Sequence, residues 1–162
     1  MIALQITELK AFMGKLLASN TFDDFLLQEA TLQMGIGYVI DGHINEAFYQ
    51  TEEDQLTERQ PFITYGEVRS TLFDLIKGKR TPLAFQVVLQ LSPKRCVILF
   101  PEGLDAHLIK GLIMNIRFDG SRALITSGVS YTSFSLDRAP ELIWDEALMN
   151  FLRSAGIIFD QI

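Results

Sequence analysis

Three stretches of the chain place apolar residues at the spacing of one buried helical face. The first follows Thr7, the second follows Thr64 and Glu67, and the third runs from Pro140 to Arg153. Their apolar positions are Leu9, Phe12, Met13, Leu16 and Leu17; Val68, Leu72, Leu75 and Ile76; and Ile143, Ala147, Leu148, Phe151 and Leu152. We therefore predict three main helices that bury one face each.

The starts of these helices carry residues that often cap helices. Thr7 is expected to cap the first helix, and Thr64 is expected to form a capping box with Glu67 at the second. A serine followed by Pro93 is typical of a helix start, because the fixed backbone angle of proline suits the first helical position. A short additional helix is therefore predicted over residues 93–99.

Between the helices, short apolar runs have the composition or the period of β-strands. The expected strands are Met1–Ile6, Phe25–Met34, Tyr38–Ile40, His43–Tyr49, Leu83–Leu91, Gly111–Phe118, Arg122–Thr126, Tyr131–Leu136 and Ile157–Phe159. Asp119-Gly120 is the strongest hairpin signal. The polar stretch Thr51–Gln60 is expected to be a mobile loop. Because the strands come in hairpin-like groups, we predict an α+β fold with a mostly antiparallel sheet, as a single globular domain over residues 1–162.

Composition narrows the class of protein. The 162 residues are 48% hydrophobic and 21% charged, an ordinary globular balance. The net charge of −6 argues against broad electrostatic capture of nucleic acid. The single cysteine, Cys96, excludes a disulfide within the chain and favours a reducing compartment. No secretory signal or membrane-spanning stretch is recognised, so we expect a cytoplasmic protein that does not enter membranes.

The sequence contains none of the common cofactor or nucleophile motifs. Gly35-Ile36-Gly37 lacks the third glycine of a dinucleotide fingerprint, and Gly78-Lys79 lacks the upstream glycine of a P-loop. There is no nucleophile elbow, and Cys96 lies in an apolar run that indicates an inert buried thiol. We therefore assign no catalytic residue and no cofactor.

Metal chemistry finds little support either. Asp41, His43 and Glu46 carry oxygen and nitrogen donors close together in sequence. Their spacing is not distinctive for a metal site, and a polar turn after a strand explains them. We therefore predict no metal site.

The segment from Lys77 to Arg80 is the densest positive cluster in this acidic chain. Gly78 is placed to take a left-handed conformation after the second helix, and Lys77 would complement the negative end of the helix dipole. Helix capping does not account for Lys79 and Arg80. We therefore name Lys77, Lys79 and Arg80 as candidate ligand-binding residues for a phosphate or an acidic partner segment.

The sequence resembles an uncharacterised bacterial domain-of-unknown-function family along nearly its whole length. The stretches that carry the resemblance are MIALQITELKAFMGKLL, FDDFLLQEATL, LIKGKRTPLAFQVVLQLSP, GLIMNIRFDG and YTSFSLD. The resemblance implies no activity, cofactor or partner.

The order of elements is also similar, more weakly, to one module of the ring-shaped DNA sliding clamps. That likeness implies a clamp-like arrangement of strands and helices. Clamp modules line a DNA channel with basic helices, whereas here Lys10, Lys15, Arg69 and Lys77 are interspersed with acidic residues. A shared architecture does not establish a shared function.

Three functional hypotheses follow, in order of preference. The first is a non-catalytic binding or assembly domain of unknown partner, with a homo-oligomer left open. The second is a small enzyme whose site is assembled from distant residues, with candidates Glu29, Asp41, His43 and His107. The third is phosphate or nucleic-acid binding through the turn from Lys77 to Arg80, extended by Arg117 and Arg122 if the two regions meet in space.

Overall fold

A computed structural model describes residues 1–49, 60–100 and 106–162. Seven antiparallel strands form one sheet in the order β3-β2-β4-β5-β6-β1-β7. The strands are β1 Ala3–Ile6, β2 Leu26–Gln33, β3 Gly37–Asp41, β4 Ala84–Gln90, β5 Ile109–Phe118, β6 Ala123–Tyr131 and β7 Phe159–Gln161. The α-helices among the described residues are α1 Leu9–Leu17, α3 Tyr65–Ile76, α4 Pro93–Leu99 and α5 Ala139–Ser154, with 3-10 turns η1 Glu46–Phe48 and η2 Ala106–Leu108. The α+β prediction is confirmed.

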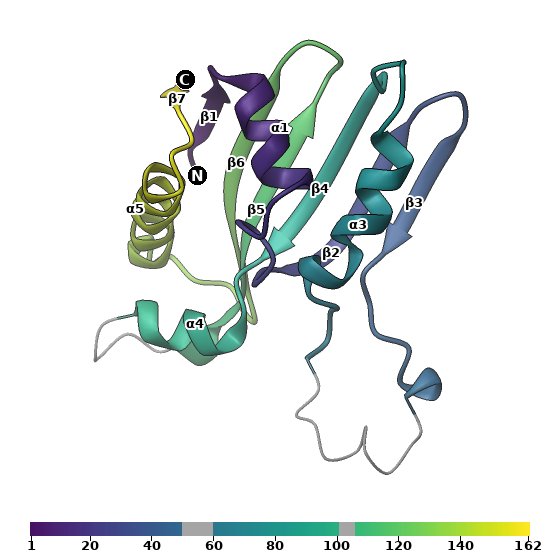
Figure 1. The fold of residues 1–162 in the computed structure, drawn as a ribbon. Coiled ribbons are helices and arrows are strands. Elements are labelled where there is room, and N and C mark those ends of the chain that lie inside the picture. Colours follow the sequence, from purple (N-terminus) through teal and green to yellow (C-terminus); the bar gives the residue numbers. More distant parts are fainter. Residues whose placement is uncertain (50–59, 101–105) are drawn as a thin grey trace.

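Helices cover one face of the sheet, and no described helix covers the other. Figure 1 shows α1, α3 and α5 side by side on one face, with α4 across one end. Strands alternate accordingly: in β5, Leu112, Met114 and Ile116 are fully buried on the helix side. The alternate residues Asn115 and Arg117 project from the opposite face and are more accessible to solvent. The period-two pattern of the sequence therefore corresponds to one buried and one open face.

The aromatic residues at the end of α1 join α1 to α5. The Phe22 ring packs edge-on against Phe12 of α1 and against Phe151 of α5, with centroid separations of 6.2 and 5.6 Å. Phe25 also contacts Phe151, at 5.2 Å. The side chain of Ser127 on β6 donates to the carboxylate of the buried Asp145, which holds α5 against the sheet.

Tyr65 connects α3 to α1. Its ring is fully buried, and its hydroxyl donates to the carbonyl oxygen of Leu16 at 2.8 Å. Four residues later, Arg69 forms an ion pair with Asp23, with 2.7 Å between Nε and Oδ1. One face of α3 thus forms a buried hydrogen bond to α1 and a partly buried ion pair to the segment that follows α1.

Two predicted strands are wrong. Residues 43–49 form only an isolated bridge at His43 and the short turn η1. Residues 132–136 leave the sheet after β6 and leave Phe134 and Leu136 exposed. Alternating apolar residues form a strand only where another strand is available to bond, and neither segment has one for its full length. The predicted loop over residues 51–60 lies outside the described residues except for Gln60.

The N-cap residue of α1 is Glu8, one residue after the predicted Thr7, whereas Thr64 occupies the N-cap position of α3 as predicted. The side chains of Thr7 and Thr64 make no capping bond. Thr7 donates to the carbonyl of Ile158, and Thr64 contacts the carboxylate of Glu67 at 3.4 Å. The short helix over residues 93–99 is confirmed, with Pro93 at its start.

Glycines occupy the turns that need them. Gly120 has φ +99° in the β5–β6 hairpin, and Gly78 has φ +148° just past α3. The hairpin prediction is confirmed. Gly78 has the predicted positive φ, although not the compact left-handed helical value near +57°.

Gly42 is required for another reason. The segment 61–64 inserts between the start of β2 and the continuation of β3, where the Ile63 N–H donates to the Gly42 carbonyl at 2.9 Å. A Cβ on Gly42 would lie 1.7 Å from the carbonyl oxygen of Leu27. The backbones can approach this closely only because position 42 has no side chain.

We expect Gly42→Ala to destabilise the protein by at least about 2 kcal/mol, because backbone atoms must move. The control Gly14→Ala should instead stabilise it by about 0.5–1 kcal/mol, since helical Gly14 has open space around its Cα. Urea unfolding followed by circular dichroism measures both. Equal stability of the two variants would contradict the close-approach account.

Candidate functional site

The basic turn from Lys77 to Arg80 is exposed at one end of the sheet. Lys77 pairs with Asp74 of the same helix, with 3.0 Å between Nζ and Oδ1. Lys79 and Arg80 form no ion pair with any described residue. Lys77 is thus explained by the helix end, and the other two remain available to a ligand.

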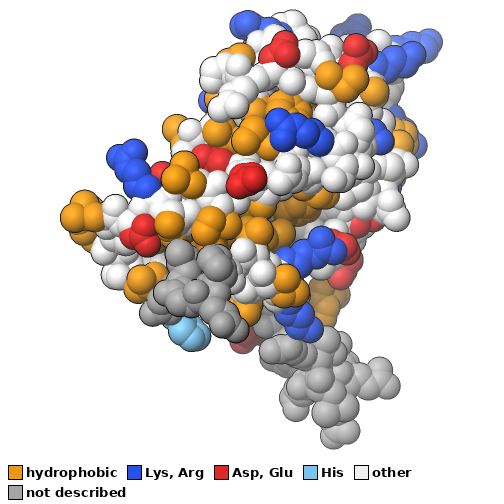
Figure 2. Space-filling view, turned by 90° about the vertical axis from the view of Figure 1, so that its left-hand side faces the viewer, with side chains coloured by type: hydrophobic (Ala, Val, Ile, Leu, Met, Phe, Trp, Pro, Cys, Tyr) orange, Lys and Arg blue, Asp and Glu red, His pale blue; other side chains and the backbone are white. Residues whose placement is uncertain are grey.

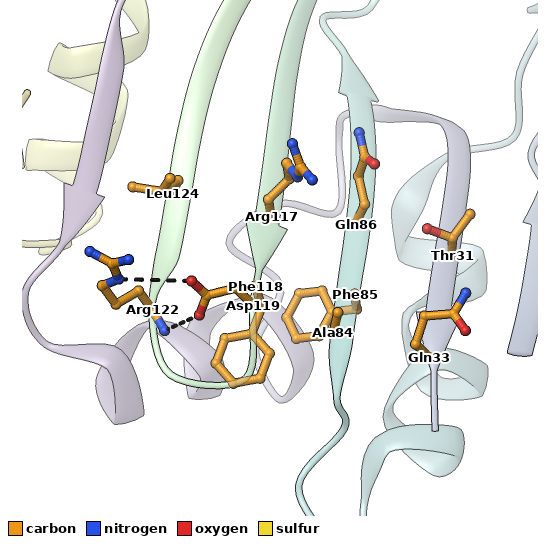
Figure 3. A pocket seen from close by; sticks show the side chains of 10 residues that line it. All are labelled: Thr31, Gln33, Ala84, Phe85, Gln86, Arg117, Phe118, Asp119, Arg122 and Leu124. Atoms are coloured by element: carbon orange, nitrogen blue, oxygen red, sulfur yellow. Dashed lines mark hydrogen bonds and ion pairs between the residues drawn. The ribbon is translucent and has the colours of Figure 1, made fainter. Parts of the chain in front are cut away.

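The structure brings this basic turn near the β5–β6 hairpin. A Cβ on Gly120 would lie only 2.9 Å from the carbonyl oxygen of Leu83, three residues after Arg80. Beside this contact lies a hollow of about 380 Å³ on the open sheet face, drawn in Figure 3. Arg117 and Arg122 line it, whereas Lys79 and Arg80 do not.

Polar side chains from three neighbouring strands form the floor of this hollow. Thr31, Gln86 and Arg117 lie in one register row across β2, β4 and β5, and Figure 3 shows Arg117 and Gln86 projecting side by side. Gln86 Nε2 donates to Asn115 at 2.8 Å, and Arg122 Nε is 3.8 Å from Asp119. Arg117 has no ion pair within the described chain and can accept an anion.

A second hollow, of about 830 Å³, lies further along the open face. Glu29, Asp41 and His43 line it, which are three of the four residues proposed as enzyme candidates from the sequence. His107 is not among its lining residues. Glu29 and Asp41 are direct cross-strand partners, and His43 Nδ1 lies 2.6 Å from Asp41 Oδ1.

The Asp41–His43 pair does not extend to a nucleophile. Ser130 lines the same hollow, but it lies on β6, four strand spacings from β3 and therefore about 19 Å away. Both members of the pair are largely exposed. No group of three or more histidine, cysteine or acidic side chains among the described residues is arranged to hold a metal ion.

Cys96 lies on α4 and is the buried residue of that helix. Burial raises the pKa of its thiol, because the thiolate would lose hydration. The reactive thiolate form is therefore disfavoured, which agrees with the prediction that Cys96 is an inert packing residue.

The third hollow is an apolar groove of about 480 Å³ between α4 and α5. Its lining residues are Phe25, Leu91, Arg95, Ile98, Leu99, Trp144, Ala147 and Phe151. Figure 2 shows apolar side chains gathered in a hollow across this face. The indole N–H of Trp144 donates inward to the carbonyl of Ile113 at 2.9 Å, so the ring is held with its polar atom already bonded.

Further apolar side chains are exposed on the segments next to this groove. Ile98 of α4 is 82% exposed, and Val97 beside it and Leu142 of α5 are also exposed. Phe134 and Leu136, which precede α5, are exposed too. Exposed apolar side chains beside an apolar groove are typical of a surface that contacts another molecule.

The sequence did not reveal this groove. Ile98 and Trp144 each fit a packed helix, and Phe25 is far from both along the chain. One signal was available: α4 is a short helix with apolar residues at four consecutive positions, Cys96–Leu99, so it cannot bury all of them against one core.

The chain belongs to a family of unknown function (DUF5721), whose model matches residues 15–160. No curated protein and no solved structure matches the chain. The expected family membership is thus shown, and no relative supplies an activity. Among the described residues, no helix has the length and apolar character needed to cross a bilayer.

We expect the pKa of Asp41 to lie below its ordinary value, because the backbone N–H and ring of His43 both bond to its carboxylate. His43→Ala keeps the backbone bond and removes the ring, so the pKa of Asp41 should rise only part of the way. NMR titration of the Asp41 carboxyl carbon measures this pKa in the wild-type protein and in the variant. An unchanged pKa in the variant would show that the ring bond is not formed in solution.

Proposed function

We propose that this protein is a non-catalytic binding domain that holds an apolar polypeptide segment of a partner in the groove between α4 and α5. The observation that carries the proposal is the groove itself, with its exposed apolar rim. The enzyme hypothesis has weaker support, because Asp41 and His43 lie within hydrogen-bonding distance of each other but His107 does not line their hollow.

The chemistry of the groove favours a polypeptide with apolar side chains. Phe25, Leu99 and Phe151 supply apolar surface, while the charge of Arg95 at the margin is already paired with Asp24 at 2.9 Å. A peptide bound in the groove therefore needs no charged side chain to pair with Arg95. Burial of apolar surface would supply the affinity, at about 25 cal/mol per Å² before the costs of association.

Trp144 allows a direct test, because it is the one tryptophan of the chain and lines the groove. Displayed peptides are selected against the wild-type protein, and the enriched peptides are titrated while tryptophan emission is recorded. We expect apolar peptides to be enriched and to shift the emission as they cover the groove. Enrichment of polar peptides that leave the emission unchanged would overturn the proposal.

The matched variants are Ile98→Asp and Leu83→Asp. Both remove an exposed apolar side chain, but Leu83 precedes β4 at the end of the sheet away from α4. Ile98→Asp should weaken peptide binding at least about tenfold, which corresponds to 1.4 kcal/mol. Leu83→Asp should leave it unchanged, and equal effects of the two substitutions would contradict a site at the groove.

We also propose that residues 1–162 act as one domain and that the protein works in the cytoplasm. Support for one domain comes from the buried side chains of the described residues, nearly all of which belong to a single hydrophobic cluster. Support for a reducing compartment comes from Cys96, which stays a free thiol.

A second candidate function is anion binding at the basic end formed by Lys79, Arg80 and Arg117. The specific observation in its favour is the close approach of Gly120 and Leu83, which brings the basic turn and the β5–β6 hairpin to one end of the sheet. A phosphate group is the chemistry that such guanidinium and ammonium groups bind.

We expect the double variant Lys79→Ala with Arg80→Ala to weaken binding of inorganic phosphate and of a labelled single-stranded oligonucleotide. If the oligonucleotide binds, its salt dependence should also flatten. The charge-matched control is Lys94→Ala with Lys110→Ala, on α4 and near the start of β5. Calorimetry measures the binding of phosphate, and fluorescence anisotropy measures the binding of the labelled oligonucleotide. Equal losses of affinity in both double variants would exclude a site at this turn.

A further inference from the structure

The outer edge of β3 is open to another strand. Of the strands described, only β2 pairs with β3, and Figure 1 shows β3 at the margin of the sheet with α3 over its neighbours. The opposite margin is β7, which has three residues against five in β3. The longer free edge is therefore at β3.

The alternation of hydrogen bonds between β2 and β3 shows which backbone groups of β3 are free. Gly42 donates to the carbonyl of Gln28 at 2.9 Å, and Glu29 lies opposite Asp41. Bonded and non-bonded pairs alternate along an antiparallel ladder, so Tyr38 and Ile40 direct their N–H and C=O groups toward β2. The remaining strand positions, Gly37, Val39 and Asp41, direct theirs outward.

Few of the usual protective features occur along this edge. The strand Gly37–Asp41 contains no lysine, arginine or proline, and its one charge is at the end. Val39, in the middle, is 72% exposed on the open face. Strand edges without charge, proline or a covering element pair readily with another chain.

We propose that β3 is a self-association edge, at which two copies of this chain pair their β3 strands antiparallel with Val39 opposite Val39. In that register the outward groups of Gly37 of one copy meet those of Asp41 of the other, and the two Val39 residues exchange both of their backbone bonds. The pairing joins the two sheets into one across a twofold axis.

The sequence of the strand is complementary to itself in this register. Asp41 lies opposite Gly37, so the two carboxylates stay apart. On the helix side, Tyr38 of each copy lies opposite Ile40 of the other, an aromatic and β-branched pair of the kind that stabilises sheets. Shifting the strands so that Asp41 faces Asp41 would oppose like charges and shorten the overlap.

The pairing buries little surface, because each copy supplies one strand of five residues. Interfaces that small fall below the usual size of stable complexes. The dimer is therefore expected to dissociate on dilution. Pairing at β3 also leaves the groove between α4 and α5 free.

Sedimentation equilibrium over a concentration series tests the proposal. The wild-type chain should show a monomer–dimer equilibrium. Val39→Pro removes an outward N–H without touching the bonds to β2, and should raise the dimer Kd at least about tenfold. Val39→Glu, which places two carboxylates opposite each other, should do the same without a backbone change.

The matched control is Gln161→Pro at the other edge. Ile162 donates to Ala3 and Thr7 donates to Ile158, so the N–H of Gln161 also points outward by the same alternation. This variant should dimerise like the wild type. A wild-type chain that stays monomeric at all concentrations overturns the proposal, as does a dimer that Gln161→Pro disrupts or that neither Val39 variant weakens. Far-UV circular dichroism confirms that each variant is folded, and the glutamate variant decides the outcome if the proline variant is not.

Discussion

Burial of one face of the seven-stranded sheet beneath α1, α3 and α5 is the constraint on which the rest of the structure depends. Each large apolar side chain fully removed from water contributes about 1.5–3 kcal/mol, and every long strand presents several such residues to the helices. The Phe22 and Tyr65 contacts then determine how α1 meets α5 and α3. Because all of this burial is on one side, the opposite face of the sheet remains polar and open.

This one-sided arrangement also sets the spacing of the side chains on the open face. On a sheet, neighbouring side chains of one face are spaced by the strand separation of about 4.8 Å, and more distant strands keep their side chains far apart. Asp41 and His43 meet because they are two residues apart on one segment. A metal site would need several ligating groups to point at one place, and the described residues contain no such group of three or more histidine, cysteine or acidic side chains.

The proposed binding surfaces lie where the covering layer ends. The short helix α4 meets α5 across a groove because its consecutive apolar residues cannot all reach the core. Among the described strands β3 is the last of the sheet, so its outer edge has no partner strand there, and the proposed basic end lies where the turn before β4 approaches the β5–β6 hairpin. These three surfaces lie on different parts of the molecule, so a partner in the groove, a second copy at β3 and an anion at the basic end need not compete.

The sequence by itself determined the local elements and their apolar faces. Helical and alternating periods predicted α1, α3 and α5 and nearly all strands, because these patterns depend on residues a few positions apart. The same reasoning failed at residues 132–136, where alternation found no partner strand, and at Thr7 and Thr64, whose hydroxyls bond elsewhere. Only the tertiary structure decided the strand order, the contact between Gly120 and Leu83, and the groove that joins Phe25 to Trp144. Those features depend on pairings between segments far apart in the chain, and a local pattern shows which residues are buried without showing what covers them.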